Sequence, residues 1–113
     1  MKKGIIVTGS QGSGKTVKIK GLVNQIPLNQ IVWIHPDLGK IQLSSFIKKD
    51  TTTVVIDLIV NLEQMKEIHN YIKEGNKLSN IFPQIIVSVN SIFFPDLANF
   101  ENDFEIIKLK GKF

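Results

Sequence analysis

Residues 4–16 read GIIVTGSQGSGKT, and the predicted fold is built around them. It begins with the β-branched run Ile5 to Val7, and a short apolar run that stops at a glycine predicts a buried β-strand. A turn rich in glycine and serine follows, and apolar residues recur at helical spacing after Lys15. The sequence therefore predicts a strand, a tight loop and a helix in direct succession.

The loop has a spacing that suits a bound polyphosphate. A glycine and four variable residues precede Gly-Lys-Thr, and the motif runs from Gly9 to Thr16. Glycines let the backbone curl so that successive N–H groups point inward, and the positive end of the following helix favours phosphate. In this pattern the Lys15 ammonium bridges the β- and γ-phosphates and the Thr16 hydroxyl ligates Mg²⁺. The predicted binding residues are Gly9, Ser10, Gln11, Gly12, Ser13, Gly14, Lys15, Thr16 and Val17.

This motif is the Walker A pattern, and with it the chain resembles the P-loop NTPase family. The resemblance is specific in this motif and looser over the rest of the chain. It implies a nucleoside triphosphate ligand, with Mg²⁺ as its companion ion.

Strands and helices alternate beyond the loop. Further strands are predicted at 30–35, 54–56, 84–90 and 104–109, and helices at 15–24, 41–48 and 61–74. Asn61 is the expected N-cap of the last helix and Gly75 its C-cap. The expected buried stripes are Ile19, Leu22, Val23 and Ile26 in the first helix and Leu62, Met65, Ile68, His69 and Ile72 in the last. Continuous apolar strands predict an α/β, three-layer P-loop NTPase fold with a mainly parallel five-stranded sheet, as one domain over residues 1–113.

A second motif lies at the end of the third predicted strand. Val54 to Asp57 is an apolar strand that closes on an aspartate, and in P-loop proteins such a residue holds Mg²⁺. The carboxyl ends of parallel strands share one edge of the sheet, so Asp57 is expected near the loop. The alternative is an ordinary strand-ending aspartate.

The number of strands resembles the additional-strand branch of P-loop ATPases, which includes RecA-like and AAA-like proteins. There the fourth strand lies between the first and the third and ends in a polar residue near the γ-phosphate. Ser88 and Asn90 are the candidates for that residue. We favour Asn90 because it closes the strand, although a strand-ending asparagine is equally typical of a turn.

The residue that would activate water departs from the pattern of this branch. Many of its members have a glutamate directly after the aspartate, where this chain has Leu58. RecA-like members carry the carboxylate at the end of the second strand, and Asp37 resembles it with a side chain one methylene shorter. The alternatives are that Asp37 is a turn residue, or that His35 contacts phosphate or water. The predicted catalytic residues are Lys15, Asp37 and Asn90.

All 14 residues in the Lys and Arg classes are lysine, and this limits the chemistry. An arginine finger accelerates phosphoryl transfer by about 10³–10⁵, and this chain has none to offer. The composition therefore disfavours a small-molecule kinase and predicts slow hydrolysis, or hydrolysis that needs an arginine from a partner protein. Base-recognition motifs of GTPases are missing, so ATP is the expected nucleotide.

Two partner predictions remain open. The net charge is +4, and Lys108, Lys110 and Lys112 alternate, which puts them on one face of a terminal strand. The stretch Pro83 to Ile86 resembles the fourth strand of zonular-occludens-toxin-like, DNA-handling ATPases of phage and mobile elements, which implies DNA as a partner. The alternative is a nucleotide-binding module or regulatory subunit without hydrolysis.

The sequence also predicts where the protein acts. It has no cysteine, so it contains no disulfide or thiolate metal site. The apolar run after Lys2 and Lys3 is shorter than the roughly 7–15 residues of a signal peptide, and no run reaches the ~18 residues of a membrane span. We expect a soluble, cytoplasmic protein without a membrane partner.

Overall fold

A computed structural model describes residues 4–10, 12–35, 46–59, 61–78, 83–91 and 96–109. Its centre is a five-stranded sheet in which every pairing is parallel. The strands are β1 (Gly4–Gly9), β2 (Ile31–Ile34), β3 (Thr53–Ile59), β4 (Gln84–Asn90) and β5 (Phe104–Lys108). The helices are α1 (Lys15–Val23) and α2 (Leu62–Leu78), with short 3₁₀ turns at η1 (Leu28–Gln30) and η4 (Ala98–Phe100).

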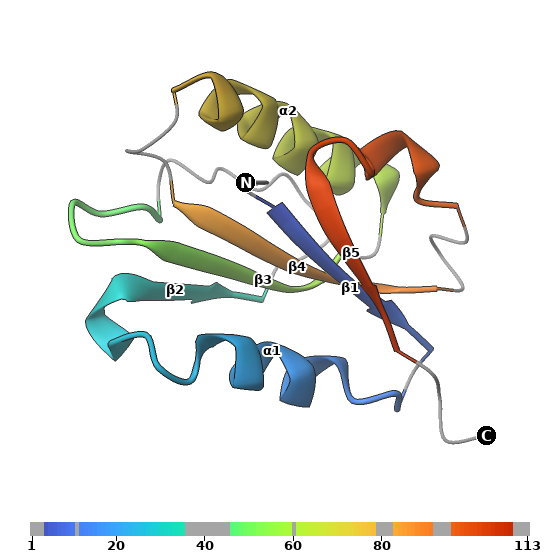
Figure 1. The fold of residues 1–113 in the computed structure, drawn as a ribbon, viewed down its shortest axis with the longest axis horizontal. Coiled ribbons are helices and arrows are strands. Elements are labelled where there is room, and N and C mark those ends of the chain that lie inside the picture. The colour runs from blue at the N-terminus through green and yellow to red at the C-terminus, as the bar shows by residue number, and fades with distance from the viewer. Residues whose placement is uncertain are drawn as a thin grey trace.

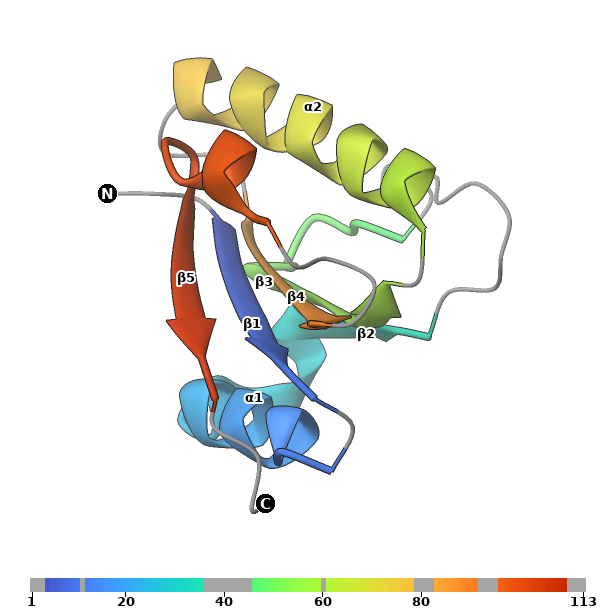
Figure 2. The same cartoon turned by 90° about the vertical axis from the view of Figure 1, so that its right-hand side faces the viewer.

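The two helices cover opposite faces of the sheet. Figure 1 shows α2 above the strands and α1 below them, and Figure 2 shows the same three layers from the side. The predicted α/β, three-layer architecture with five strands is therefore confirmed, and the sheet is parallel throughout its described strands.

The strand order is β2-β3-β4-β1-β5. The fourth strand thus lies between the first and the third, as the resemblance to the additional-strand branch implied. Strand β1 is internal and pairs with β4 on one side and β5 on the other. The carboxyl end of β1 therefore lies between the ends of β4 and β5, and the predicted loop begins there.

Alternate residues of the strands enter two separate cores. Ile6 points to the α2 side, where it packs in a cluster with Met65, Ile68 and Phe104. Val7 points to the α1 side and packs with a cluster that includes Ile19, Val23, Val55 and Ile86. Because both faces are covered, the strands read as continuous apolar runs and not as alternating ones.

Helix α2 begins where the sequence predicts and ends later. The backbone N–H of Gln64 donates a 2.9 Å hydrogen bond to Asn61 Oδ1, which confirms the N-cap. The prediction of a C-cap at Gly75 was wrong, because the helix continues through it to Leu78. A glycine inside a helix lowers the stability of the helix by only about 1 kcal/mol relative to alanine. The backbone hydrogen bonds of the additional turn offset this cost.

Two leucines of the predicted buried stripes are exposed. Leu22 is 37% exposed, since helical spacing puts it at the margin of the stripe centred on Ile19 and Val23. Leu62 is 51% exposed at the first position of α2. Helical spacing fixes the side on which a residue lies but not how far the sheet extends beneath the helix. The prediction that Leu22 and Leu62 are buried was therefore wrong.

His69, a member of the predicted buried stripe, is half-buried and makes a polar contact as well as apolar ones. Its Nε2 lies 2.8 Å from Asp103 Oδ2, and its ring contacts Phe100 and Phe104. This pair ties α2 to the turn that precedes β5. The short helix predicted at 41–48 falls mainly on residues outside the described ranges. Within those ranges no helix has the length and apolar character that crossing a membrane would need.

Candidate functional site

The loop between β1 and α1 depends on two glycines with left-handed backbone. Gly12 has φ +80° and Gly14 has φ +89°, values that other residues adopt only with strain. Between them the chain turns tightly, and the N–H of Ser13 donates a 3.1 Å hydrogen bond to the carbonyl of Ser10. The two glycines of the motif are therefore required by the conformation of the loop.

Gly9 is required for a different reason, which is close packing. A Cβ at this position would lie 2.4 Å from Ser13 Oγ and 3.2 Å from the carbonyl oxygen of Leu109. The Ser13 hydroxyl is buried and has no hydrogen-bond partner among the described residues. The loop thus folds back against the end of β1, where a larger residue would push it away.

The Lys15 ammonium lies against the backbone of its own loop. Its Nζ donates hydrogen bonds to the carbonyls of Gly9 (3.2 Å) and Ser10 (2.9 Å). Burial lowers the pKa of Lys15 below its ordinary value of 10.5, and the nearby charge of Asp57 opposes that shift. Neutral carbonyls are weaker partners for an ammonium than an anion is, so an anionic ligand can compete for this side chain.

The first turn of α1 presents its backbone N–H groups toward the loop. Gly14 is the N-cap, so no side chain caps the helix, and the first turn contains no acidic residue. The partial positive charge of a helix N-terminus is therefore not neutralised from within the helix. Such an end favours a bound anion.

Asp57 lies across from the loop in a network that spans two strands. Its Oδ1 accepts a 3.0 Å hydrogen bond from the hydroxyl of Ser88, which is fully buried. Its Oδ2 lies 3.8 Å from Nδ1 of His35, a largely exposed side chain. The Asp57 carboxylate is thus fixed by Ser88 while its outer edge faces solvent.

Leu58 is the one described residue other than glycine that has positive φ, at +72°. It coincides with a shift of register between β3 and β4, between Ile56 and Ile59. The N–H of Leu58 donates a 2.6 Å hydrogen bond to Ser88 Oγ, so the same hydroxyl holds the strained backbone and the carboxylate. Strain of this kind, of about 1–3 kcal/mol, tends to occur at functional sites.

Several of these residues line one open cleft of about 510 Å³. The residues that line it are Gly12, Gly14, Lys15, Thr16, Val17, Asp57, Leu58 and Asn90. The cleft therefore brings together the predicted Mg²⁺ ligands Thr16 and Asp57 with the predicted catalytic residues Lys15 and Asn90. Three of the predicted binding residues, Gly9, Ser10 and Ser13, shape the loop without lining the cleft.

The oxygen atoms available in this cleft fit a hard divalent cation. Mg²⁺ prefers oxygen ligands and is typically bound by one or two carboxylates with phosphate oxygens. The Asp57 carboxylate and the Thr16 hydroxyl line the same cleft and supply that type of donor. No group of three or more His, Cys, Asp or Glu gathers anywhere in the described ranges, the cleft included, so an ion held here would need phosphate oxygens as further ligands.

Some predicted site residues lie outside the described ranges. They are Gln11, Asp37, Lys110 and Lys112. His35, the alternative to Asp37, approaches Asp57, as described above. Lys108 closes β5 and is exposed.

Ser88 has a larger role than the sequence indicates, and the conformation of Leu58 has no signal in the sequence. Asn90, the favoured candidate, ends the strand and lines the cleft. Ser88 is the residue that contacts Asp57, and its two-residue spacing from Asn90 was the available signal. Nothing in the sequence signals the positive φ of Leu58, since leucine is an unfavourable residue for that backbone.

Comparison with known proteins adds no family assignment. No protein-family model matches the chain, and no curated protein matches it significantly.

Proposed function

We propose that this chain binds a nucleoside triphosphate, as its Mg²⁺ complex, in the cleft between the loop and Asp57. One observation carries the proposal: the glycine loop, Lys15, Thr16 and Asp57 reach the same cleft from the ends of β1 and β3. Ligands of parallel α/β sheets bind at the carboxyl ends of the strands, which supports this location. The arrangement resembles that of a P-loop NTPase, and we propose that the chain is one.

Each residue has a chemical role in this proposal. The loop N–H groups and the start of α1 surround the phosphates, and Lys15 exchanges two carbonyl partners for phosphate oxygens. Thr16 and Asp57 hold the ion, whose charge would neutralise the phosphates. Ser88 orients the carboxylate of Asp57. ATP is the proposed nucleotide, because the chain lacks the base-recognition motif of GTPases.

We further propose that hydrolysis is slow without a partner protein. Asn90 offers a polar side chain to the cleft, and Asp37 is the proposed base that orients water. No arginine is present to stabilise charge that develops on the γ-phosphate. A partner protein that contributes an arginine would increase the rate.

A non-hydrolysing nucleotide-binding module is the second candidate. Leu58 favours it, because an aliphatic side chain that is 40% exposed lines the cleft directly after Asp57. Such a side chain cannot accept a proton from water. On this alternative the chain is a switch or regulatory subunit, and triphosphate binding is its whole activity.

The biological setting is proposed from the resemblance of the 83–86 stretch to DNA-handling ATPases of phage and mobile elements. Lys108 is exposed at the end of β5, which supports a contact with DNA phosphates. We also propose that the protein acts in the cytoplasm.

Phosphate release with Mg²⁺ and ATP, with and without DNA, separates the two candidates. The ATPase proposal predicts slow release by the wild-type chain, loss of release with retained binding in Asp37→Asn, and a DNA-dependent rate. The module proposal predicts binding with no release under any of these conditions. Absence of triphosphate binding by the wild-type chain would reject both.

A further inference from the structure

Three polar side chains stand in a row at the carboxyl ends of β2, β3 and β4. His35 follows β2 directly, Asp57 lies in β3 and Ser88 lies in β4. Because Ile34 pairs with Ile56, His35 and Asp57 come next on neighbouring strands and point to the same face of the sheet. The hydroxyl of Ser88 reaches Asp57 from the opposite neighbour, β4. The Asp57 carboxylate therefore lies between a hydroxyl and an imidazole.

The two oxygens of this carboxylate differ in their surroundings. Oδ1 accepts a 3.0 Å hydrogen bond from Ser88, which is fully buried. Oδ2 lies 3.8 Å from Nδ1 of His35, whose side chain is 73% exposed. Oδ1 is thus fixed from beneath the cleft, and Oδ2 is the oxygen that remains for a bound ion. An imidazole nitrogen stands beside that oxygen.

The 3.8 Å separation of these two atoms suits two ligands of one metal ion. It is longer than a direct hydrogen bond, which spans about 2.7–3.2 Å. Imidazole nitrogen and carboxylate oxygen each lie about 2.0–2.2 Å from a bound metal such as Zn²⁺, so two such ligand atoms of one ion lie roughly 3–4 Å apart. His35 Nδ1 and Asp57 Oδ2 are therefore spaced to bind one ion without a shift of either strand.

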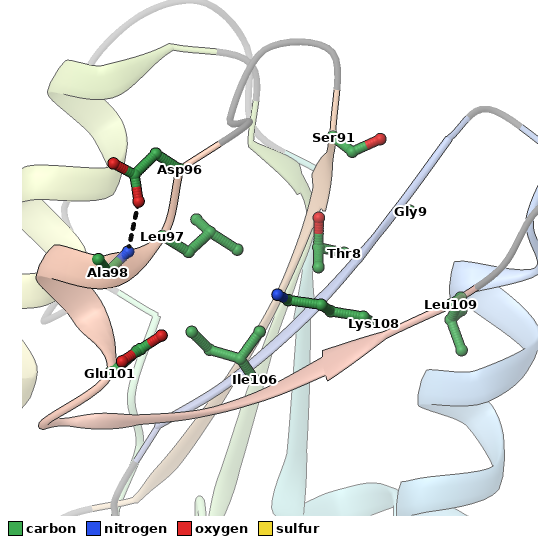
Figure 3. Close-up of a pocket in the computed structure, with 10 residues that line it drawn as sticks. All are labelled: Thr8, Gly9, Ser91, Asp96, Leu97, Ala98, Glu101, Ile106, Lys108 and Leu109. Carbon is green, nitrogen blue, oxygen red and sulfur yellow. Dashed lines mark hydrogen bonds between the residues drawn. The ribbon is translucent and has the colours of Figure 1, made fainter.

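A second cavity also contains carboxylates, but it suits an ion less well. Asp96 and Glu101 line this cavity of about 330 Å³, and Lys108 lines it with them, as Figure 3 shows. The ammonium of Lys108 repels a cation. One oxygen of Asp96 also accepts a 2.9 Å hydrogen bond from the N–H of Ala98. The pair formed by His35 and Asp57 contains no such competing cation.

The donor atoms of this pair determine the class of ion. Mg²⁺ prefers oxygen ligands, whereas imidazole nitrogen suits divalent transition metals such as Fe²⁺ and Zn²⁺. The affinity of a site with nitrogen and oxygen ligands generally rises from Mn²⁺ through Fe²⁺ and Co²⁺ to Ni²⁺. An imidazole beside the carboxylate therefore favours a transition metal over Mg²⁺.

We propose that His35 joins Asp57 as a ligand of the ion that accompanies the triphosphate, so that the site prefers a divalent transition-metal ion to Mg²⁺. This inference rests on the proposed function, because phosphate oxygens would supply further ligands. Mg²⁺ would bind at the same place through oxygen ligands alone.

The test compares the Co²⁺ and Mg²⁺ complexes of ATP, each titrated by calorimetry into the full chain. We expect the wild type to bind the Co²⁺ complex about tenfold or more tightly than the Mg²⁺ complex. His35→Phe keeps a ring and removes both nitrogens. It should lower this ratio of affinities about tenfold or more, since loss of even an outer partner of a metal ligand typically costs about 10–100-fold in metal affinity.

Proton NMR of the Co²⁺ complex identifies the ligand directly. An imidazole bound to Co²⁺ through Nδ1 gives a strongly shifted, exchangeable signal from its Nε2–H. We expect this signal in the wild type and its loss in His35→Phe. The chain has two histidines, and His69→Gln, which removes the other one, is the matched control that should keep the signal.

The outcomes separate this inference from the triphosphate proposal. Equal affinity for the two complexes, an unchanged ratio in His35→Phe, or absence of the shifted signal would overturn the role of His35 and leave the triphosphate proposal standing. Binding of neither complex by the wild type would reject the triphosphate proposal and, with it, this role of His35.

Discussion

The Ser88 hydroxyl donates a 3.0 Å hydrogen bond to Asp57 Oδ1 and accepts one of 2.6 Å from the N–H of Leu58. Ser88 is fully buried and does not line the candidate cleft. A residue beneath the cleft therefore sets the direction of the carboxylate in it. The same residue also holds the only strained non-glycine backbone of the described ranges.

We expect Ser88→Ala to affect both ion binding and stability. Loss of the hydroxyl frees Asp57 to rotate, and removal of such a supporting contact typically costs about 10–100-fold in metal affinity. It also removes the acceptor of the Leu58 N–H, which should lower the free energy of unfolding by about 1–3 kcal/mol. The measurements are triphosphate affinity over a Mg²⁺ titration and urea unfolding. Ser91→Ala is the control, and an equal loss of Mg²⁺ dependence in that variant would contradict the assigned role.

Leu58 allows a direct test of backbone strain. At φ +72°, alanine keeps the strain of about 1–2 kcal/mol while glycine removes it. We expect Leu58→Gly to be more stable than Leu58→Ala by about 1 kcal/mol, the reverse of the usual order of these residues in regular structure. Urea unfolding of the two variants measures this difference. A less stable glycine variant would show that the backbone of Leu58 is not strained.

Substitution by alanine should change the stability of the protein in opposite directions at Gly14 and Gly21. Gly21 lies inside α1 with open space around its Cα, so Gly21→Ala should stabilise the protein by about 0.5–1 kcal/mol. Gly14 has φ +89°, so Gly14→Ala should destabilise it by about 1–2 kcal/mol and weaken triphosphate binding. Thermal unfolding of both variants provides the comparison. Similar effects at the two positions would contradict the described loop.

Much of the fold followed from local pattern. The run Ile5 to Val7, the glycines and the Asn61 cap are short-range signals, and the structure has the expected strand, loop and helix there. The prediction of a helix end at Gly75 was wrong, because glycine permits a helix end without imposing one. Exposure of Leu22 and Leu62 depends on how far the sheet reaches, which helical spacing does not encode.

The candidate site was predictable in its motifs but not in its contacts. Lys15, Thr16 and Asp57 could be grouped because parallel strands share one carboxyl edge. The contact of Ser88 with Asp57 depends on the register of β3 and β4, which is irregular just there.

Alkaline pH should reveal the burial of Lys15. Its pKa in the folded state is lowered by burial, so in the range just below 10.5 the folded state gives up this proton before the unfolded state does. At lower pH Lys15 is charged in both states, and burial of that charge destabilises the folded protein by its full amount. This destabilisation disappears as the pH rises toward 10.5, because the buried ammonium loses its proton. The stability of the wild type relative to Lys15→Met should therefore rise over that range, as urea midpoints measure. A difference that stays constant or falls would contradict this environment for Lys15.

Calorimetric titration with Mg²⁺ and ATP tests whether the loop from Gly9 to Thr16 forms a triphosphate site. We predict saturable binding at one site by the wild type and a loss of about 10–100-fold in Lys15→Met, as expected for hydrogen bonds between charged groups. Lys18→Met removes the same charge from an exposed position of α1 and should bind like the wild type. No binding by the wild type, or an equal loss in both variants, would contradict the account.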